Sequence, residues 1–456
     1  MTSNQPTAAL SFHAANALLA DGWAQDVRID SSGGRITALT VGVPWDGQAQ
    51  RLGVVVAGLG NLHSHAFQRA MAGLTEVGGR SGDSFWSWRE LMYRFLDRLD
   101  PDTFQAIAAQ AYMEMLESGF TRVGEFHYLH HTEDGRRYAD HAEMATRVAA
   151  AADETGLGLT LLPVFYAHSD FGGVAPVPAQ RRFLHDVDGF AELLQGCMRA
   201  LAGTDGVLGL APHSLRACTP DELQALVAMA PGPVHIHIAE QTREVDACLA
   251  WSGQRPVQWL YANAAVDARW CLVHATHVDA DEVRLMAGSG AVVGLCPITE
   301  ANLGDGLFPM RDFVQAGGRF GVGSDSNVLI DAAEELRLLE YGQRLQLRGR
   351  NVLSPGPLST GRWLYEQAGN GAAQALGTQA GLSIGAPVDL LELDTLHPAL
   401  LDRTGDALLD SWLFAARNGA LRGVWRNGRQ LVRDGQHVNR EAISMRYRAA
   451  LGRILA

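Results

Sequence analysis

Four short apolar runs in this chain end in histidine or carboxylate side chains. They are GVVVAGLGNLHSH with His63 and His65, HIHIAE with His237 and Glu240, CLVHATH with His274, and FGVGSD with Asp325. Each run has the length and composition of a buried β-strand. Parallel α/β barrels place metal ligands and catalytic groups at the C-terminal ends of their strands. The order of these residues therefore predicts one metal site, assembled from four strands that are distant in the sequence.

Candidate strands alternate with helical patterns through the middle of the chain. One such pattern, over residues 101–119, ends at a glycine that is typical of a helix C-cap. Alternating strands and helices favour a parallel sheet. We therefore predict an α/β fold, a TIM-like (β/α)8 barrel over residues 53–385. Its expected strands cover residues 54–63, 121–130, 159–168, 207–214, 233–240, 270–278, 291–297 and 320–325.

Short β segments at both ends of the chain predict a second, smaller domain. VRIDSSGGRITALTVG reads as strand, turn and strand, and GVWRNGRQLVRDGQHV contains Asn427-Gly428, a strong hairpin signal. We expect residues 1–52 and 386–456 to pair into one small β-sandwich-like domain, with the barrel inserted between them. The second segment is expected to end in a helix.

The composition limits the classes of partner. The chain has 456 residues and a formal net charge of −13, which argues against nucleic acid and membrane, because nucleic acid and anionic membranes select basic surfaces. No window of about 20 residues is purely apolar, and no signal peptide is evident. Five cysteines without a C-x-x-C pair indicate free thiols in a reducing compartment. We expect a cytoplasmic protein that forms a homodimer.

Residue spacing within two of the runs is suited to metal binding. His63 and His65 are two residues apart, and such side chains face the same side of a strand. His235 and His237 share a face in the same way; His237 lies nearer the C-terminal end and is the better ligand candidate, whereas His235 fits a second-layer or packed core histidine. With Asp325, this set offers three imidazoles and a carboxylate, which suits zinc.

Glu240, His274 and Asp325 are candidates for acid–base chemistry. Zinc would lower the pKa of a bound water toward about 7. Asp325 could then accept a proton from that water, and His274 could hold the resulting hydroxide from the other side. Glu240 could protonate a substrate nitrogen. Two alternatives stay open at this point: Glu240 as a surface loop carboxylate, and Asp325 as a helix N-cap, since Ser-Asp-Ser-Asn sequences cap helices.

The basic residues bear on the number of metal ions. All 37 of them are arginine, and the chain contains no lysine. Some barrel metallohydrolases bridge two metals with a carboxylated lysine, and this chain cannot build that bridge. We therefore predict one Zn²⁺ per subunit.

Two nearby segments resemble a known family. NLHSHAFQRAMAGLTE (61–76) and SFWSWRELMYRF (84–95) are similar to the N-formimino-L-glutamate iminohydrolases, also called formimidoylglutamate deiminases. These belong to the mononuclear deaminase branch of the amidohydrolase superfamily. The resemblance covers essentially the whole chain, through GSDSN (323–327) to RNGRQLVRDG (426–435). The metal motifs are shared by the superfamily, whereas F-W-S-W-R-E is specific to the subtype.

This resemblance implies a function and a set of residue roles. The implied reaction is zinc-dependent hydrolysis of N-formimino-L-glutamate to N-formyl-L-glutamate and ammonia, in histidine degradation. The implied residues are the zinc ligands His63, His65, His237 and Asp325, the acid–base groups Glu240, His274 and Asp325, and the substrate-binding side chains of Gln68, Arg89, Tyr128, His213 and Arg216.

A substrate-binding role for the two arginines also has support that does not depend on the family resemblance. Arg89 follows the first predicted strand and Arg216 the fourth, so both belong to the loop face that carries the metal ligands, where they could bind a dicarboxylate substrate. From the residues alone, Arg89 could equally be a solvated surface arginine. Another deaminase of this branch, acting on guanine or a triazine, remains an alternative, although a neutral heterocycle would not need two arginines. A catalytically inactive metal-binding barrel is a third reading, against which Glu240, His274 and Asp325 argue.

Overall fold

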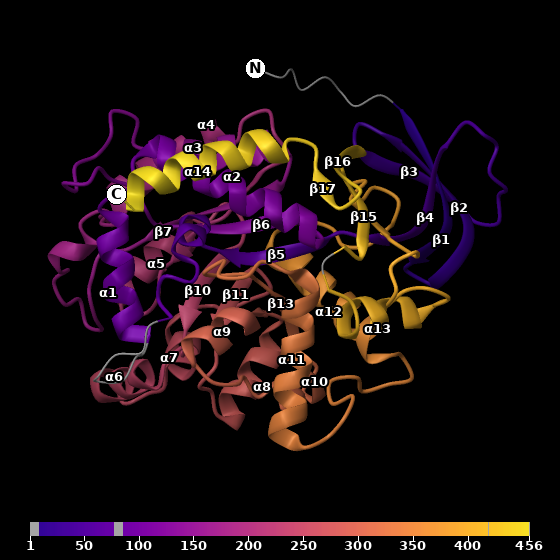
Figure 1. Ribbon diagram of the computed structural model, residues 1–456. Helices are drawn as coiled ribbons and strands as arrows, with labels where there is room; N and C mark the ends of the chain where they lie inside the picture. The colour runs from indigo at the N-terminus through magenta and orange to yellow at the C-terminus, as the bar shows by residue number, and fades with distance from the viewer. Residues whose placement is uncertain (1–8, 77–84, 418, 456) are drawn as a thin grey trace.

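A computed structural model describes residues 9–76, 85–417 and 419–455. Its centre is an α/β arrangement with two parallel sheets surrounded by helices (Figure 1), which confirms the predicted fold class at that level. One sheet contains β5 (Leu59–Ser64), β6 (Phe120–His127), β7 (Gly158–Phe165), β8 (Val207–Leu208) and β9 (Ala211–Pro212). The other contains β10 (Val234–Ile238), β11 (Trp270–His274), β12 (Val292–Leu295) and β13 (Arg319–Val322).

Single β-bridges link the two parallel sheets at both of their junctions. Ser64, at the end of β5, pairs with Asp325 just after β13, and Ser214 pairs with His237 in β10. All of these residues lie at or just beyond the C-terminal ends of their strands. The bridges therefore join the end of the first predicted strand to the last, and the end of the fourth to the fifth.

Helices connect the successive strands, and their ends follow the local sequence signals. The side chain of Asp100 caps α2 (Pro101–Ser118) by accepting a hydrogen bond from Thr103 N, and the helix ends at Gly119 with a φ of 106°. The other helices of this part are α1 (Phe85–Leu96), α3 (Glu143–Thr155), α4 (Val187–Ala200), α5 (Pro220–Met229), α6 (Thr242–Ser252), α7 (Pro256–Asn263), α8 (Ala280–Ser289), α9 (Pro297–Leu303), α10 (Met310–Gln315), α11 (Ala332–Leu347) and α12 (Thr360–Ala375), with the 3₁₀ turns η1 (Ala66–Met71) and η2 (Pro178–Gln180).

The first predicted barrel strand is divided between two sheets. Residues up to Ala57 form β4 (Gln50–Ala57), which pairs with β1 and β14, whereas β5 pairs with β6. Gly58 separates the two strands, and a Cβ atom at this position would collide with the Thr121 side chain. Residues 53–57, which we placed in the barrel, therefore lie in the sheet of the small domain.

The two ends of the chain pair into that second sheet, drawn in indigo and yellow at the right of Figure 1. Asn427 and Gly428 form the predicted hairpin turn, with φ values of 49° and 78°, as a type I′ turn requires. The strands form one hydrogen-bonded sheet rather than the two sheets of a sandwich. In order across the sheet they are β17 (Gln436–His437), β16 (Arg429–Arg433), β15 (Leu421–Arg426), β14 (Leu390–Leu393), β4, β1 (Leu10–Leu19), β2 (Gly22–Ser32) and β3 (Arg35–Thr40).

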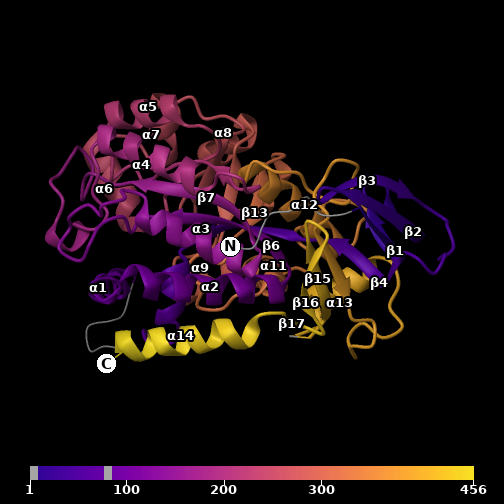
Figure 2. The same cartoon turned by 90° about the horizontal axis from the view of Figure 1, so that it is seen from above.

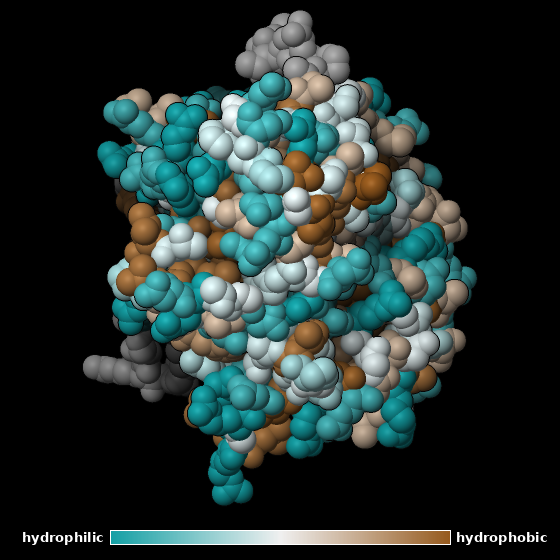
Figure 3. All heavy atoms as spheres, turned by 90° about the vertical axis from the view of Figure 1, so that its right-hand side faces the viewer, coloured by the Kyte–Doolittle hydropathy of each residue, from teal (hydrophilic) through white to brown (hydrophobic). Residues whose placement is uncertain are grey.

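The C-terminal segment also carries two helices, α13 (Asp406–Phe414) and α14 (Arg440–Leu455). The predicted terminal helix is α14, which packs along α2 (Figure 2). On the side of the molecule that carries the small sheet, hydrophobic and hydrophilic residues are intermixed (Figure 3). Within the described ranges, no helix is both long enough and apolar enough to cross a membrane.

A buried histidine outside the predicted metal set leads to a prediction about acid stability. His185 is 6% exposed, neither of its ring nitrogens has a hydrogen-bond partner among the residues that the structure describes, and burial lowers its pKa to about 3. Because this value lies below that of an unfolded histidine, acid protonates the unfolded chain first. The stabilisation by neutral His185 is therefore complete above about pH 6.5 and is lost as the pH falls toward 3. Between pH 7 and pH 5.5, the stability advantage of the wild type over His185→Leu should shrink by about 1 kcal/mol in urea unfolding. An advantage that does not change with pH would contradict the prediction.

Candidate active site

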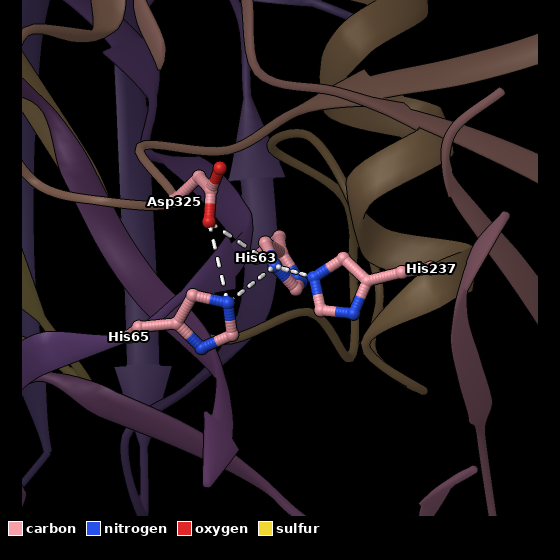
Figure 4. Close-up of side chains that lie close together, drawn as sticks. All are labelled: His63, His65, His237 and Asp325. Atoms are coloured by element: carbon pink, nitrogen blue, oxygen red, sulfur yellow. Dashed lines mark hydrogen bonds and ion pairs between the residues drawn. The ribbon is translucent and has the colours of Figure 1, made fainter. Parts of the chain in front are cut away.

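Four side chains converge at the C-terminal ends of β5 and β10 and just beyond β13 (Figure 4). The Nε2 atom of His63 lies 3.2 Å from His65 Nε2 and 3.1 Å from His237 Nε2. The Oδ1 atom of Asp325 lies 3.4 Å from His63 Nε2 and 3.3 Å from His65 Nε2. All four residues are buried. The structure thus brings together the four residues that we predicted as metal ligands.

The spacing and protonation of this group fit a metal ion better than a hydrogen-bond network. Around a tetrahedral ion with bonds of about 2.0–2.1 Å, ligand atoms lie roughly 3.3–3.4 Å apart. The Nδ1 atoms of His65 and His237 lie 2.9 Å and 3.1 Å from the backbone oxygens of Phe126 and His213. Donation to these carbonyls leaves the Nε2 lone pairs free for a metal. In a hydrogen-bond network, by contrast, the single Nε2–H of His63 could not donate to both His65 Nε2 and His237 Nε2.

Burial also keeps these imidazoles neutral. It lowers the pKa of His63 and His237 well below the usual value, and that of His65 to a smaller extent, because the attraction of Asp325 opposes the effect there. A metal competes with protons for the imidazole nitrogen, so a histidine that stays neutral at physiological pH is a ready ligand.

Asp325 does not act as a helix N-cap. The next helix, α11, begins at Ala332, and its cap is Asp331, which accepts hydrogen bonds from Ala333 N and Glu334 N. The backbone of Asp325 has a φ of 45°, an uncommon conformation for a residue other than glycine. The cap alternative is therefore wrong, and the Asp325 carboxylate points at the histidines.

His274 and Glu240 lie beside the four ligand candidates. The Nε2 atom of His274 is 3.8 Å from an oxygen of Glu240 and 3.8 Å from Asp325 Oδ2. Burial alone would lower the pKa of His274, but Glu240, Glu300 and Asp325 outweigh it and raise that pKa to about 10. Burial raises the pKa of Glu240 to about 7. Glu240 is 6% exposed, so the surface-loop alternative is wrong, and its proton affinity suits proton transfer near neutral pH.

A cavity opens onto this group. It is lined by every predicted site residue except His63, which is fully buried. The additional residues in its wall are Trp88, Met92, Tyr93, Tyr166, Phe183 and Leu303. The predicted substrate-binding residues therefore share one cavity with the predicted catalytic groups.

Among the described residues of the cavity wall, two polar atoms are buried and have no hydrogen-bond partner in the described part of the chain. They are Nε of Arg216 and Oε1 of Gln68. Gln68 uses its amide nitrogen to donate to Tyr128 Oη at 2.9 Å. Buried polar groups are normally paired, so an unpaired guanidinium N–H and an unpaired amide oxygen suit a ligand that carries both a carboxylate and N–H groups.

The second arginine is held by aromatic rings. The guanidinium carbon of Arg89 lies 4.5 Å from the ring centre of Trp86 and 5.9 Å from that of Tyr93. Cation–π contacts at this distance orient the guanidinium plane. Arg89 is partly exposed and faces the cavity, so it is not a fully solvated surface residue. His213 stays neutral beside the arginines, because burial and then the charge of Arg216 lower its pKa.

His235 and the carboxylate of Glu300 complete the comparison between the structure and the predictions from the sequence. His235 points away from the metal candidates, with Nε2 2.8 Å from the backbone oxygen of Ala375. Glu300 in α9 was not predicted, although its Oε1 lies 3.2 Å from His274 Nδ1. It follows the seventh predicted strand as CPITE, and its position after a strand end was the available signal.

Comparisons with known proteins agree with this geometry. Residues 54–431 match the amidohydrolase family, and residues 11–52 match "Formimidoylglutamate deiminase HutF, N-terminal domain". The formimidoylglutamate deiminase of Pseudomonas aeruginosa is 52% identical over 97% of this chain and 99% of its own length. A crystal structure of an amidohydrolase from Brucella melitensis superposes with a TM-score of 0.95 at 53% identity, covering 98% of this chain and 100% of that one.

More distant structures share the fold alone. One is an adenosine deaminase from Xanthomonas campestris with bound zinc, with a TM-score of 0.81 at 20% identity over 98% of this chain and 99% of that one. The two family matches and the full-length similarity to a curated relative assign the chain. It belongs to the amidohydrolase family, in the branch that contains the formimidoylglutamate deiminases.

Proposed function

We propose that this protein is a metal-dependent hydrolase that converts N-formimino-L-glutamate and water into N-formyl-L-glutamate and ammonia, a step of histidine degradation. The observation that carries the proposal is one cavity that is lined by Arg89 and Arg216 together with three of the four predicted metal ligands and the acid–base groups. The similarity to the Pseudomonas enzyme supports the same reaction. The parallel sheets, bridged at both junctions, also support a closed (β/α)8 barrel around the cavity.

The ligand set fits zinc, held by His63, His65, His237 and Asp325. When bound there, zinc would lower the pKa of water toward about 7 and so supply a nucleophile at neutral pH. A bound cation would also lower the pKa values of the neighbouring acid–base groups. The similarity in fold to an adenosine deaminase with bound zinc is consistent with this proposal. The five cysteines are free and buried, which suits a reducing cytoplasm.

The protein side chains would provide the proton transfers. Asp325 accepts a proton from the attacking water, and His274, within 3.8 Å of Asp325 Oδ2, steadies that water. The water oxygen bonds to the formimino carbon, and Glu240 delivers a proton to the departing nitrogen. As the carbon–nitrogen bond breaks, Asp325 passes the proton that it accepted to this nitrogen, which leaves as ammonia. The remaining hydroxyl gives its proton back to Glu240 and becomes the formyl oxygen. Arg216 and Arg89 would bind the two carboxylates of the substrate, and Gln68 Oε1 would accept an N–H from it.

The experiment that tests the function is an assay of ammonia release from N-formimino-L-glutamate, N-formimino-L-aspartate and guanine. We expect the first to be the best substrate, because its two carboxylates match two arginines. Turnover of guanine without turnover of formiminoglutamate would reject the proposal in favour of another deaminase of the family. No turnover of any of them by the metal-loaded protein would favour the catalytically inactive reading.

The metal content gives a further prediction. The protein should bind one divalent ion per chain at full activity, because it has no lysine to carboxylate and bridge a second ion. Elemental analysis of the fully active protein after gel filtration measures this number. Two tightly held ions per chain would contradict the prediction.

A further inference from the structure

The buried carboxylate of Glu300 lies behind the candidate catalytic histidine. Glu300 belongs to α9, which directly follows β12, and the residue is 6% exposed. Its Oε1 atom accepts a hydrogen bond from Cys296 N at 2.9 Å and lies 3.2 Å from Nδ1 of His274. The contact with His274 joins the side chains of two neighbouring strand ends, because β11 pairs with β12.

The imidazole of His274 has polar partners on both of its nitrogens. Nδ1 meets Glu300, and Nε2 lies 3.8 Å from both Glu240 and Asp325. The backbone of His274 has a φ of 67°, which is uncommon outside glycine and shows that the strand end is turned. A ring on such a turn could rotate about its χ2 torsion unless a partner holds one face. A carboxylate on Nδ1 is the usual device for selecting the tautomer and orientation of a functional histidine.

We propose that Glu300 is a positioning residue: it accepts the Nδ1–H of His274 and so keeps Nε2 directed toward Glu240 and Asp325. The inference rests on the proposed function for its effect on catalysis. It does not place Glu300 in contact with the substrate, because Glu300 does not line the cavity.

The same atoms allow a competing interpretation as a second metal site. Ligand atoms of His274, Cys296 and Glu300 lie within 4.8 Å of one another, and all three residues are buried. The hydrogen bonds of Glu300 to His274 and to the backbone of Cys296 already account for this grouping, however. We therefore favour orientation of His274 over metal binding.

Glu335 provides a matched control. It is also fully buried, and it accepts a hydrogen bond from Ile298 N, in the same helix as Glu300, at 3.0 Å. Replacing either glutamate with methionine removes a carboxylate of similar size from the same neighbourhood and leaves one backbone N–H without its partner. A purely structural role of Glu300 would therefore make the two variants behave alike.

The kinetic test compares Glu300→Met, Glu300→Gln and Glu335→Met with formiminoglutamate. Glu300→Met should lower kcat roughly 10–100-fold, with KM changed by no more than about twofold. Glu300→Gln should recover much of this loss, because its amide oxygen can still accept the Nδ1–H. Glu335→Met should retain kcat within about threefold even if its thermal midpoint falls. Equal losses of kcat in Glu300→Met and Glu335→Met, or no loss in Glu300→Met, would overturn the proposal.

A spectroscopic readout separates this inference from the proposed function. In protein labelled with ¹⁵N-histidine, the signal lost in His274→Asn identifies His274, and its Nδ1 should carry a proton that Glu300→Met exposes to faster exchange. An Nδ1 without a proton in the wild type would overturn the proposal. This measurement applies even if the wild type does not hydrolyse formiminoglutamate, a result that would reject only the proposed function. Titration with Co²⁺ tests the competing interpretation: a second equivalent that produces a thiolate absorption band, absent in Cys296→Ser, would overturn the positioning role.

Discussion

Replacing Asp325 with asparagine should lower kcat for formiminoglutamate by roughly 10²–10⁴-fold or more, the range expected when an acid–base group is lost. The substitution keeps the shape of the side chain but removes its charge and its ability to accept a proton. The two carboxylate oxygens of Asp325 face different partners, with Oδ1 toward His63 and His65 and Oδ2 toward His274. Steady-state ammonia release, with metal content measured on the same samples, gives the result.

Asp331→Asn is the matched control for this experiment. Asp331 caps α11 through its side chain, and asparagine caps helices about as well as aspartate does. The control should therefore keep its metal and nearly normal turnover. If Asp325→Asn also keeps both, Asp325 has no role in the chemistry, and the mechanism proposed here fails.

Replacing Arg216 with methionine should reduce kcat/KM for formiminoglutamate by roughly tenfold to over a hundredfold. Arg216 is 8% exposed, and its Nε has no partner within the described part of the chain. Burial would lower its pKa, but Glu244, Tyr166 and Glu240 raise it, so the group stays charged. Arg89→Met should have an effect of the same kind. The zinc content should not change in either variant, because neither arginine belongs to the ligand set.

Substrate analogues make this test specific. Formiminated γ-aminobutyrate and formiminated α-aminobutyrate each lack one carboxylate of the substrate. Each arginine variant should lose little further with the analogue that lacks its partner, because that interaction is already absent. Arg422→Met, at an exposed ion pair with Asp434, serves as a control and should behave as the wild type. If both cavity variants process formiminoglutamate normally, the acidic-substrate reading fails, and a guanine or triazine deaminase becomes the better proposal.

Much of the fold and the grouping of the site could be predicted because the signals are local. Apolar runs of strand length and glycine or Asn-Gly turns depend on a few neighbouring residues, and they indicated the α/β class and the hairpin at Asn427. The polar residues at the strand ends indicated that His63, His237 and Asp325 would meet, because parallel strands bring their C-terminal ends to one edge. The break at Gly58 was missed, because it depends on a close approach of Thr121 that no local pattern reveals.

The sequence by itself determined which residue types stand at the C-terminal edge of the parallel sheets. It also determined that no lysine can bridge two metal ions. Only the tertiary structure decided how those residues are used. Which of His235 and His237 joins the candidate metal ligands depends on the segment that each ring contacts. The His235 ring lies against the backbone of Ala375, and the His237 ring lies against His63. The role of Asp325 depends on α11 starting seven residues later, at Ala332. Glu300 reaches His274 only because β11 and β12 are adjacent. Side-chain contacts between distant segments follow from strand order and register, and a single stretch of sequence does not encode either of them.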